Sequence, residues 1–143
     1  MIKEFINKWY KNKDTLKKYY NNYNNIQDLT YIDIVKNIIK YILNIDSKKL
    51  LSEDIHEIDN GSYSGTKIFI IYNDTYCPEI YDYFYTYIYY GSCTVCDILQ
   101  NIIYYEEGKT EKLMNLSLDI IQNFKPMSNC NIYDTKRITY KNN

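Results

Sequence analysis

The sequence predicts a single-domain α+β fold, in which an antiparallel β-hairpin or small sheet packs against N-terminal and C-terminal helices. Two observations predict this fold. Apolar residues recur every three or four positions over residues 2–44 and again over 98–124, which is the period of amphipathic helices. Between these stretches, over 66–90, β-branched and aromatic residues dominate and alternate with a period of two, which is typical of strands. A length of 143 residues suits one domain.

Two helices are expected at the start of the chain. Residues 2–23 carry apolar side chains on one face with lysines between them, so they predict an amphipathic helix, with a break near 12–14. Thr30 and Asp33 have the spacing of a weak capping box. The apolar stripe that follows predicts a second helix over 29–44.

The middle of the chain predicts the sheet. After a short helix expected over 48–58, Asn60 and Gly61 form a turn sequence that suits positive φ. Residues 66–72 then predict a short buried strand, and 80–90 predict a longer strand with tyrosine at every odd position from 81 to 89. The loop between these strands is too short for a crossover, so we expect them to pair antiparallel.

Two more helices and a polar tail complete the expected fold. One helix is predicted over about 95–106, and the next ends before Pro126. In the tail, 132–133 and 137–140 are expected to form short edge strands. The single domain 1–143 is thus divided into an N-terminal helical segment at 1–25, a core at 26–127 and a tail at 128–143.

The composition limits the classes of partner. The formal net charge is −1 and 24% of residues are charged, so the chain has no basic field to hold nucleic acid or an anionic membrane. No apolar run approaches the roughly 20 residues of a membrane span. The N-terminus also lacks the apolar core of a secretion signal. We therefore expect a soluble cytoplasmic protein that binds neither nucleic acid nor membranes, and a homo-oligomer stays an open alternative.

Cys93 and Cys96 form the strongest chemical motif, Cys-Thr-Val-Cys, between a predicted strand and a predicted helix. A helix N-terminus stabilises a thiolate, so the pair is a candidate for thiol redox catalysis. Asp97 adds negative charge directly after the pair and opposes thiolate formation. The alternative that we favour is structural: two small buried thiols at a tight turn, with Ser92 or Asp97 capping the helix.

A zinc site is the third interpretation of the two cysteines. Structural zinc takes four ligands, which usually come from two such pairs, and this chain has one Cys-x-x-Cys. The other candidate ligands stand alone in different elements: His56, Cys77 and Cys130. We therefore expect no cofactor, with zinc at Cys93 and Cys96 as the alternative.

A row of tyrosines lies along one face of the predicted strand over 80–90. Aromatic sheet faces can stack nucleobases, but such sheets interleave basic residues, and 79–97 contains none. Half-buried structural tyrosines or a protein interface are the better interpretation, and the expected partner is a protein or a small molecule. The expected binding residues are Tyr81, Tyr83, Tyr85, Tyr87, Tyr89, Ser92 and Asp97.

Several stretches over about 55–127 also resemble a known family. The matching residues are Ile58-Asp59-Asn60-Gly61-Ser62-Tyr63-Ser64-Gly65, Phe69, Asp74-Thr75-Tyr76, Pro78, Tyr90-Gly91-Ser92-Cys93-Thr94-Val95-Cys96-Asp97-Ile98-Leu99-Gln100 and Gln122-Asn123-Phe124-Lys125-Pro126-Met127. In these residues the chain resembles small uncharacterised proteins of tailed bacteriophages and large DNA viruses, with a Tyr-Gly-Ser-Cys-x-x-Cys-Asp-x-Leu core. The resemblance implies a viral origin and no particular reaction. The lack of alanine and the abundance of Ile, Asn, Tyr and Lys agree with an AT-rich genome.

These observations predict a non-enzymatic viral accessory protein that acts in the host cytoplasm by binding a partner. Antagonism of a host defence, by binding a protein or a small nucleotide, fits the same observations. The alternative function is a thiol-redox or zinc-binding protein centred on Cys93 and Cys96.

Overall fold

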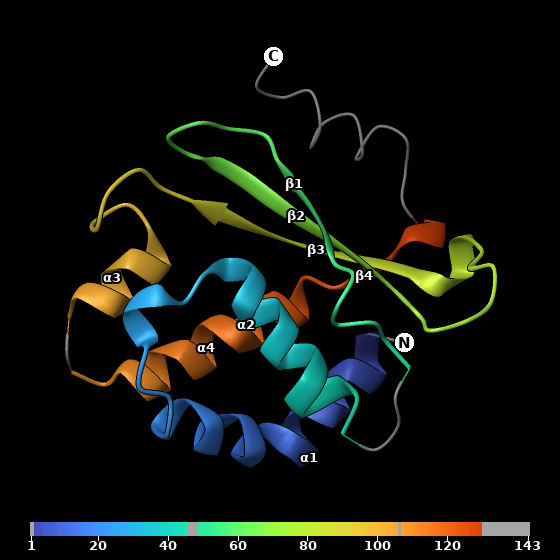
Figure 1. Ribbon diagram of the computed structural model, residues 1–143, viewed down its shortest axis with the longest axis horizontal. Helices are drawn as coiled ribbons and strands as arrows, with labels where there is room; N and C mark the ends of the chain where they lie inside the picture. The colour runs from blue at the N-terminus through green and yellow to red at the C-terminus, as the bar shows by residue number, and fades with distance from the viewer. Residues whose placement is uncertain (1, 46–48, 106, 130–143) are drawn as a thin grey trace.

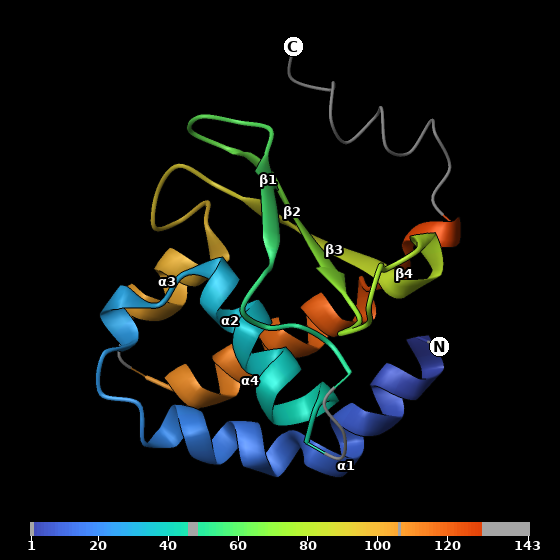
Figure 2. The same ribbon diagram turned by 45° about the vertical axis from the view of Figure 1, so that its right-hand side comes forward.

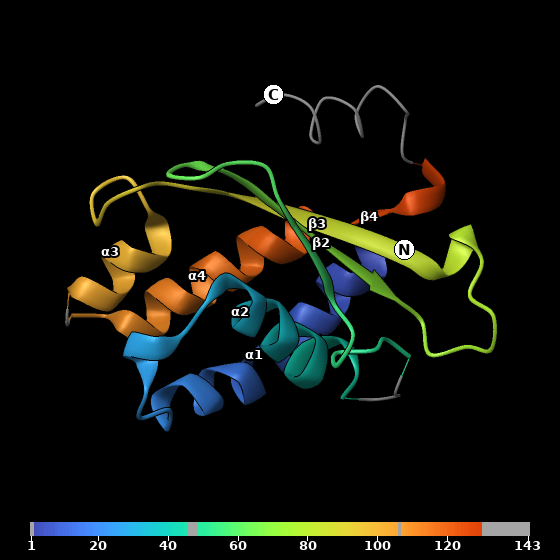
Figure 3. The ribbon, with the colours of Figure 1, turned by 45° about the horizontal axis from the view of Figure 1, so that its top comes forward.

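Helices cover one face of an antiparallel sheet in the part of the chain that the computed structural model describes, which is residues 2–45, 49–105 and 107–129 (Figure 1). The order of elements is α1 (Ile2–Asn21), η1 (Ile26–Asp28), α2 (Tyr31–Ile38), η2 (Ile39–Leu43), β1 (His56–Asp59), β2 (Gly65–Tyr72), η3 (Ile80–Asp82), β3 (Tyr83–Tyr90), α3 (Ile98–Tyr104), α4 (Lys109–Gln122), β4 (Lys125–Pro126) and η4 (Met127–Asn129). Figure 3 shows the helices together beneath the sheet. The predicted α+β fold is confirmed.

The first helix is unbroken, so the break predicted near 12–14 is wrong. Asn12 is only 7% exposed, and its Nδ2 donates to the carbonyl oxygen of Ile42 at 2.9 Å. That carbonyl belongs to η2, a π-helical turn that continues α2. Widened turns of this kind leave carbonyl groups that need other partners. The polar residue that suggested a break therefore joins α1 to η2.

The second helix begins at the predicted capping box. The Thr30 N–H donates to Asp33 Oδ2 at 3.0 Å, and the Asp33 N–H donates to Thr30 Oγ1 at 3.4 Å. These reciprocal bonds satisfy backbone donors that the first helical turn leaves free. They fix the start of α2 next to Tyr31, which becomes important at the site described below.

The described residues form a four-stranded sheet in the order β1-β2-β3-β4, with every neighbouring pair antiparallel. The predicted pairing of the two long strands is confirmed, and its register places Gly65 opposite Tyr90 and Tyr72 opposite Tyr83. The short helix expected over 48–58 is wrong, because 56–59 form the edge strand β1. The predicted strand over 80–90 begins only at Tyr83, after a turn of 3-10 helix.

The turn between β1 and β2 lies where Asn60 and Gly61 predict it, but Gly61 does not adopt positive φ. A Cβ atom at Gly61 would lie 2.0 Å from the carbonyl oxygen of Ser64. Glycine is required here because the backbone folds back on itself within four residues. The Asn60 side chain holds the far end of the turn by accepting the Thr66 N–H at 2.7 Å.

The core lies between the inner face of the sheet and the helices. Phe5 packs edge-on against Phe84 and against Phe124, with ring centroids 5.5 Å apart in both pairs. Thr86 is fully buried on the same sheet face, and its hydroxyl donates to the carbonyl oxygen of Ile120 at 2.8 Å. These contacts hold the first half of β3 against α1 and α4.

None of the helices within the described ranges is long and apolar enough to cross a membrane. The edge strands predicted at 132–133 and 137–140 lie outside the described residues, as does Cys130.

Candidate functional site

The loop between β3 and α3 carries the Cys-Thr-Val-Cys motif and is closed tightly at its base. The N–H groups of Cys96 and Asp97 donate to the carbonyl oxygen of Cys93 at 3.1 and 2.9 Å. A Cβ atom at Gly91 would lie 2.5 Å from the carbonyl carbon and oxygen of Cys96. Only glycine therefore lets the two ends of the loop approach this closely.

Asp97 ties this loop to two helices. Its carboxylate is 3% exposed, and Oδ1 accepts hydrogen bonds from the Gly91 N–H at 3.0 Å and the Tyr31 hydroxyl at 2.9 Å. Oδ2 accepts the Gln100 N–H at 2.8 Å, which makes Asp97 the N-cap of α3, as predicted. The Tyr31 hydroxyl in turn accepts the Leu99 N–H at 3.2 Å. Asp97 thus positions the loop, with both carboxylate oxygens engaged inside the protein.

The Tyr31 hydroxyl is held in its protonated form. Burial raises the pKa of Tyr31 well above its usual value, and the neighbouring Asp97 carboxylate raises this pKa further. A protonated phenol can donate to Asp97 and accept from Leu99 at the same time. The network therefore keeps its donors and acceptors matched over the ordinary pH range.

The two motif thiols are exposed, so the prediction that they are buried structural groups is wrong. Their sulfur atoms lie 3.1 Å apart. Hydrogen bonds lower the pKa of Cys93, first from the Cys96 thiol and then from the backbone N–H groups of Cys96 and Val95. The pKa of Cys96 is raised by the same thiol contact and by the charge on Cys93. When the pair loses a proton, Cys93 is therefore the thiol that loses it first.

Cys93 and Cys96 supply only two of the ligands that a zinc site needs. Among the described residues, no three His, Cys, Asp or Glu side chains gather closely enough to hold a metal ion. Cys77 and His56 are not brought to the pair: Cys77 lies in the loop after β2 and His56 begins β1. Two thiols are half of the four ligands that a structural zinc ion takes.

A hollow of about 560 Å³ opens beside the motif loop. The loops that follow β1 and β3 reach the same end of the sheet, close to the start of α2 (Figures 1 and 2). Residues from these loops, from β1, β2 and β3, from η1 and the start of α2, and from α3 line the hollow. They are Gln27, Leu29, Thr30, Tyr31, Asp59, Ser62, Tyr63, Lys67, Tyr90, Gly91, Ser92, Asp97, Leu99, Gln100 and Ile103.

Lys67 is the cation of this hollow, and aromatic rings surround it. Its Nζ lies 5.4 Å from the ring centroid of Tyr90 and 6.0 Å from that of Tyr31, and 3.5 Å from Glu57 Oε1. The Tyr90 hydroxyl donates to Asp59. Burial, and then the bond to Asp59, raises the pKa of Tyr90 to about 12. The hollow thus combines one cation, flat aromatic surfaces and acceptors in a fixed arrangement.

The predicted tyrosine face lies on the other side of the sheet. Alternate residues of a strand point to opposite faces, and Phe84 and Thr86 point to the helices, so the odd-numbered tyrosines of β3 point outward. Their exposure differs widely: Tyr85 is buried, Tyr83 and Tyr87 are half-buried, and Tyr89 and Tyr81, the latter in η3, are 67% and 68% exposed. The predicted binding residues therefore fall into two places, because Ser92 and Asp97 line the hollow on the inner side.

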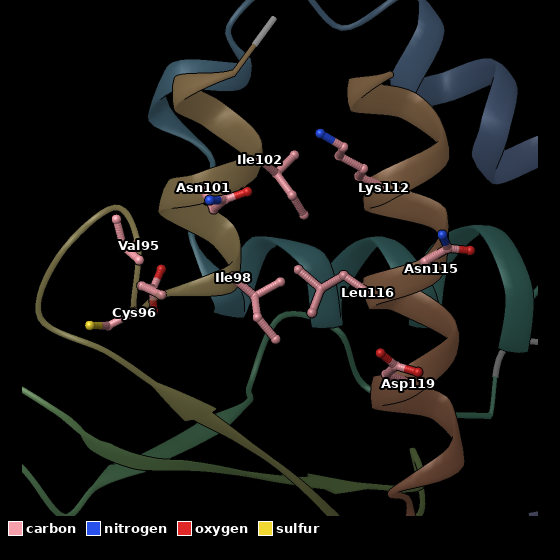
Figure 4. A pocket seen from close by; sticks show the side chains of 10 residues that line it. Val95, Cys96, Ile98, Asn101, Ile102, Lys112, Asn115, Leu116 and Asp119 are labelled. Atoms are coloured by element: carbon pink, nitrogen blue, oxygen red, sulfur yellow. The ribbon is translucent and has the colours of Figure 1, made fainter. Parts of the chain in front are cut away.

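A second, smaller hollow of about 310 Å³ lies between α3 and α4. Ile98, Ile102 and Leu116 form its apolar wall, and Lys112 reaches across its upper end (Figure 4). The Cys96 backbone borders this hollow, but the sulfur atom points away from it (Figure 4). The thiol pair and this hollow are therefore separate features.

The sequence did not identify Lys67, Tyr31 or Gln100 as site residues. A partial signal was present, because the stretches 58–65 and 90–100 that carry the family resemblance both border the larger hollow. Tyr31 comes from a helix that the motif does not include. Its role follows from packing and not from any local pattern.

Comparisons with family models, with curated proteins and with solved structures found no match to this chain. The functional argument therefore starts from the geometry of the hollow and of the thiol pair.

Proposed function

We propose that this chain is a non-enzymatic binding protein of viral origin, acting in the host cytoplasm, and that the hollow beside the motif loop holds a small polar molecule. The observation that carries the proposal is the meeting of the two motif stretches, 58–65 and 90–100, around this hollow. The tyrosine face of β3 is the competing contact surface. The viral origin rests on the motif resemblance and on the codon-biased composition.

The size and chemistry of the hollow favour a nucleoside or nucleotide. Small-molecule sites commonly enclose about 300–1,000 Å³, and the volume of 560 Å³ falls in this range. Tyr63 is 81% exposed and offers a ring for stacking, and Gln100 and Ser62 offer groups that can bond to the edge of a base. Removal of a host signalling nucleotide by such binding would antagonise a host defence.

The buried carboxylate of the hollow is suited to holding its walls and not to proton transfer. Asp97, its buried carboxylate, accepts three hydrogen bonds from within the protein. A general base needs a free lone pair directed at the substrate. Both oxygens of Asp97 are engaged within the protein, so Asp97 holds the walls in place. Asp59 supports the turn after β1, because its Oδ1 accepts the Tyr90 hydroxyl and the Gly61 N–H, the latter at 3.0 Å.

Native mass spectrometry of the full chain with a mixture of nucleosides and nucleotides tests the proposal. We expect a retained molecule in the wild type and its loss in Ser62→Trp, which fills the hollow. Ser64→Trp is the matched control, because Ser64 is an exposed serine of the same loop that does not line the hollow. Retention by Ser62→Trp, or no retention by the wild type, would overturn the proposal. Loss in Tyr89→Ser would move the site to the tyrosine face.

A further inference from the structure

We propose that Cys93 and Cys96 form a thiol–disulfide exchange site for small-molecule disulfides, in which Cys93 attacks and Cys96 resolves. The proposal does not depend on a ligand in the hollow. It starts from the position of the two thiols, which are exposed with their sulfur atoms 3.1 Å apart.

The loop holds the pair in a geometry close to that of the product. A disulfide bond is about 2.05 Å long, so the sulfur atoms need to approach by only about 1 Å. The contact of Gly91 with Cys96 and the two hydrogen bonds to the Cys93 carbonyl oxygen keep the loop closed in the reduced state. Little loop entropy then remains to be lost when the bond forms.

The two thiols are chemically unequal, which assigns their roles. The Cys93 and Cys96 sulfur atoms lie 3.1 Å apart, and interaction with the Cys96 thiol and then with the backbone N–H groups of Cys96 and Val95 lowers the pKa of Cys93. The pKa of Cys96 is raised by the contact with Cys93, so Cys96 keeps its proton at the start. A thiolate is the attacking species in disulfide exchange. Cys93 is therefore the first nucleophile.

Asp97 does not cancel this activation. Its carboxylate is buried and accepts hydrogen bonds from the Gly91 N–H, the Tyr31 hydroxyl and the Gln100 N–H. These donors offset the negative charge that the sequence places next to the pair. The charge therefore stabilises the base of the loop while the thiols remain on its outside.

The exchange proceeds in two balanced steps. In the first, the Cys93 thiolate attacks one sulfur of the small disulfide, a mixed disulfide forms on Cys93, and the other half leaves as a thiolate. In the second, Cys96 gives its proton to that thiolate and attacks the Cys93 sulfur, which releases the remaining half as a thiolate; this thiolate takes from solvent the proton that Cys93 lost before the first step. The two cysteine thiols are oxidised to a disulfide, and the small disulfide is reduced to two thiols.

A small substrate is favoured over a polypeptide by the surroundings of the pair. The smaller hollow, between α3 and α4, has the apolar wall that could hold a peptide side chain, but the Cys96 sulfur points away from it (Figure 4). Val95 is 83% exposed at the tip of the loop. Small disulfides can therefore approach the thiols from solvent.

Oxidised glutathione and intact-mass measurement test the proposal in the full chain. The background is Cys77→Ser with Cys130→Ser, so that only the pair reacts. We expect the chain to lose two hydrogen atoms with no glutathione retained. Adding Cys96→Ser to this background should leave glutathione bound to Cys93. Adding Cys93→Ser instead should slow the first reaction about tenfold, because the activated thiolate is gone.

Three results would overturn the proposal: glutathione retained on both cysteines of the pair, equal rates for the two single-thiol variants, or no faster reaction than in the urea-unfolded chain. Far-ultraviolet circular dichroism of each variant checks that it is folded. Both cysteines are exposed, so serine at either position leaves the core unchanged. Failure of nucleotide retention in the earlier experiment does not affect any of these outcomes.

Discussion

Replacing Asp97 by alanine should destabilise the protein more than any ordinary helix cap would predict. The change removes the N-cap bond to Gln100, which is worth about 1 kcal/mol. It also leaves the buried Gly91 N–H and the Tyr31 hydroxyl without their acceptor, and each unpaired buried group costs about 1–3 kcal/mol. We expect the free energy of unfolding to fall by about 3–7 kcal/mol, a large part of the stability of a domain of this size.

Asp97→Asn removes the negative charge of the side chain and keeps its shape. The amide can turn its oxygen to only one side, so its NH₂ group must face either the Gln100 N–H or the Gly91 N–H. An NH₂ group in place of Oδ2 meets one donor, and in place of Oδ1 it meets the Gly91 N–H and the Tyr31 hydroxyl. We expect the first orientation, with a loss of about 1–3 kcal/mol. Urea unfolding followed by circular dichroism measures the free energy of unfolding of both variants. An unchanged slope of this free energy against urea concentration shows that the folded and unfolded states are the same as in the wild type.

Asp82→Ala is the matched control for the Asp97 substitutions. The Asp82 carboxylate accepts one backbone N–H, that of Glu79 at 2.9 Å, and this bond is exposed. Its loss should cost less than about 1 kcal/mol. The reasoning fails if Asp97→Ala costs no more than Asp82→Ala. It also fails if the loss of unfolding free energy in the double variant equals the sum of the losses in Asp97→Ala and Tyr31→Phe within about 0.5 kcal/mol. Residues in one hydrogen-bond network should instead be energetically coupled.

Three further predictions concern other parts of the fold. Gly91→Ala should destabilise the chain by about 1–3 kcal/mol in urea unfolding, because its Cβ would overlap the Cys96 backbone; unchanged stability would refute the close approach. Burial raises the pKa of Tyr20 to about 12 from 10.0. The contribution of Tyr20 to the free energy of unfolding is therefore fully present below pH 10 and is lost as the pH rises through 12. Tyr20→Phe should flatten that alkaline decline in unfolding free energy, and an unchanged slope would contradict the assignment. Asn12→Ala should cost about 1 kcal/mol in urea unfolding, because the carbonyl of Ile42 loses its donor; a neutral result would mean that water replaces the bond.

The sequence predicted those parts of the fold that local patterns determine. The capping box at Thr30 and Asp33 and the pairing of β2 with β3 follow from spacing and alternation within short windows. The edge strand β1 did not follow, because its residues are mostly exposed and only pairing with β2 makes them a strand. In such segments, tertiary contacts determine the secondary structure more strongly than the local sequence preference does.

The site was predicted less completely, because its key contacts join distant parts of the chain. Tyr31 lies 66 positions from Asp97, and no local spacing connects them. The cap at Asp97 was predictable, since it depends on the next helical turn alone. The exposure of Cys93 and Cys96 was not, because it depends on how Gly91 closes the loop.

Amide chemical-shift mapping of the isotope-labelled chain, with the nucleoside or nucleotide that it retains, tests the central claim most directly. The claim is that the two motif stretches build one binding site. The account predicts shifts gathered at 59–67 and 90–103, with the amide of Lys67 among them. Shifts centred on 81–89, along the outer tyrosine face, would contradict it.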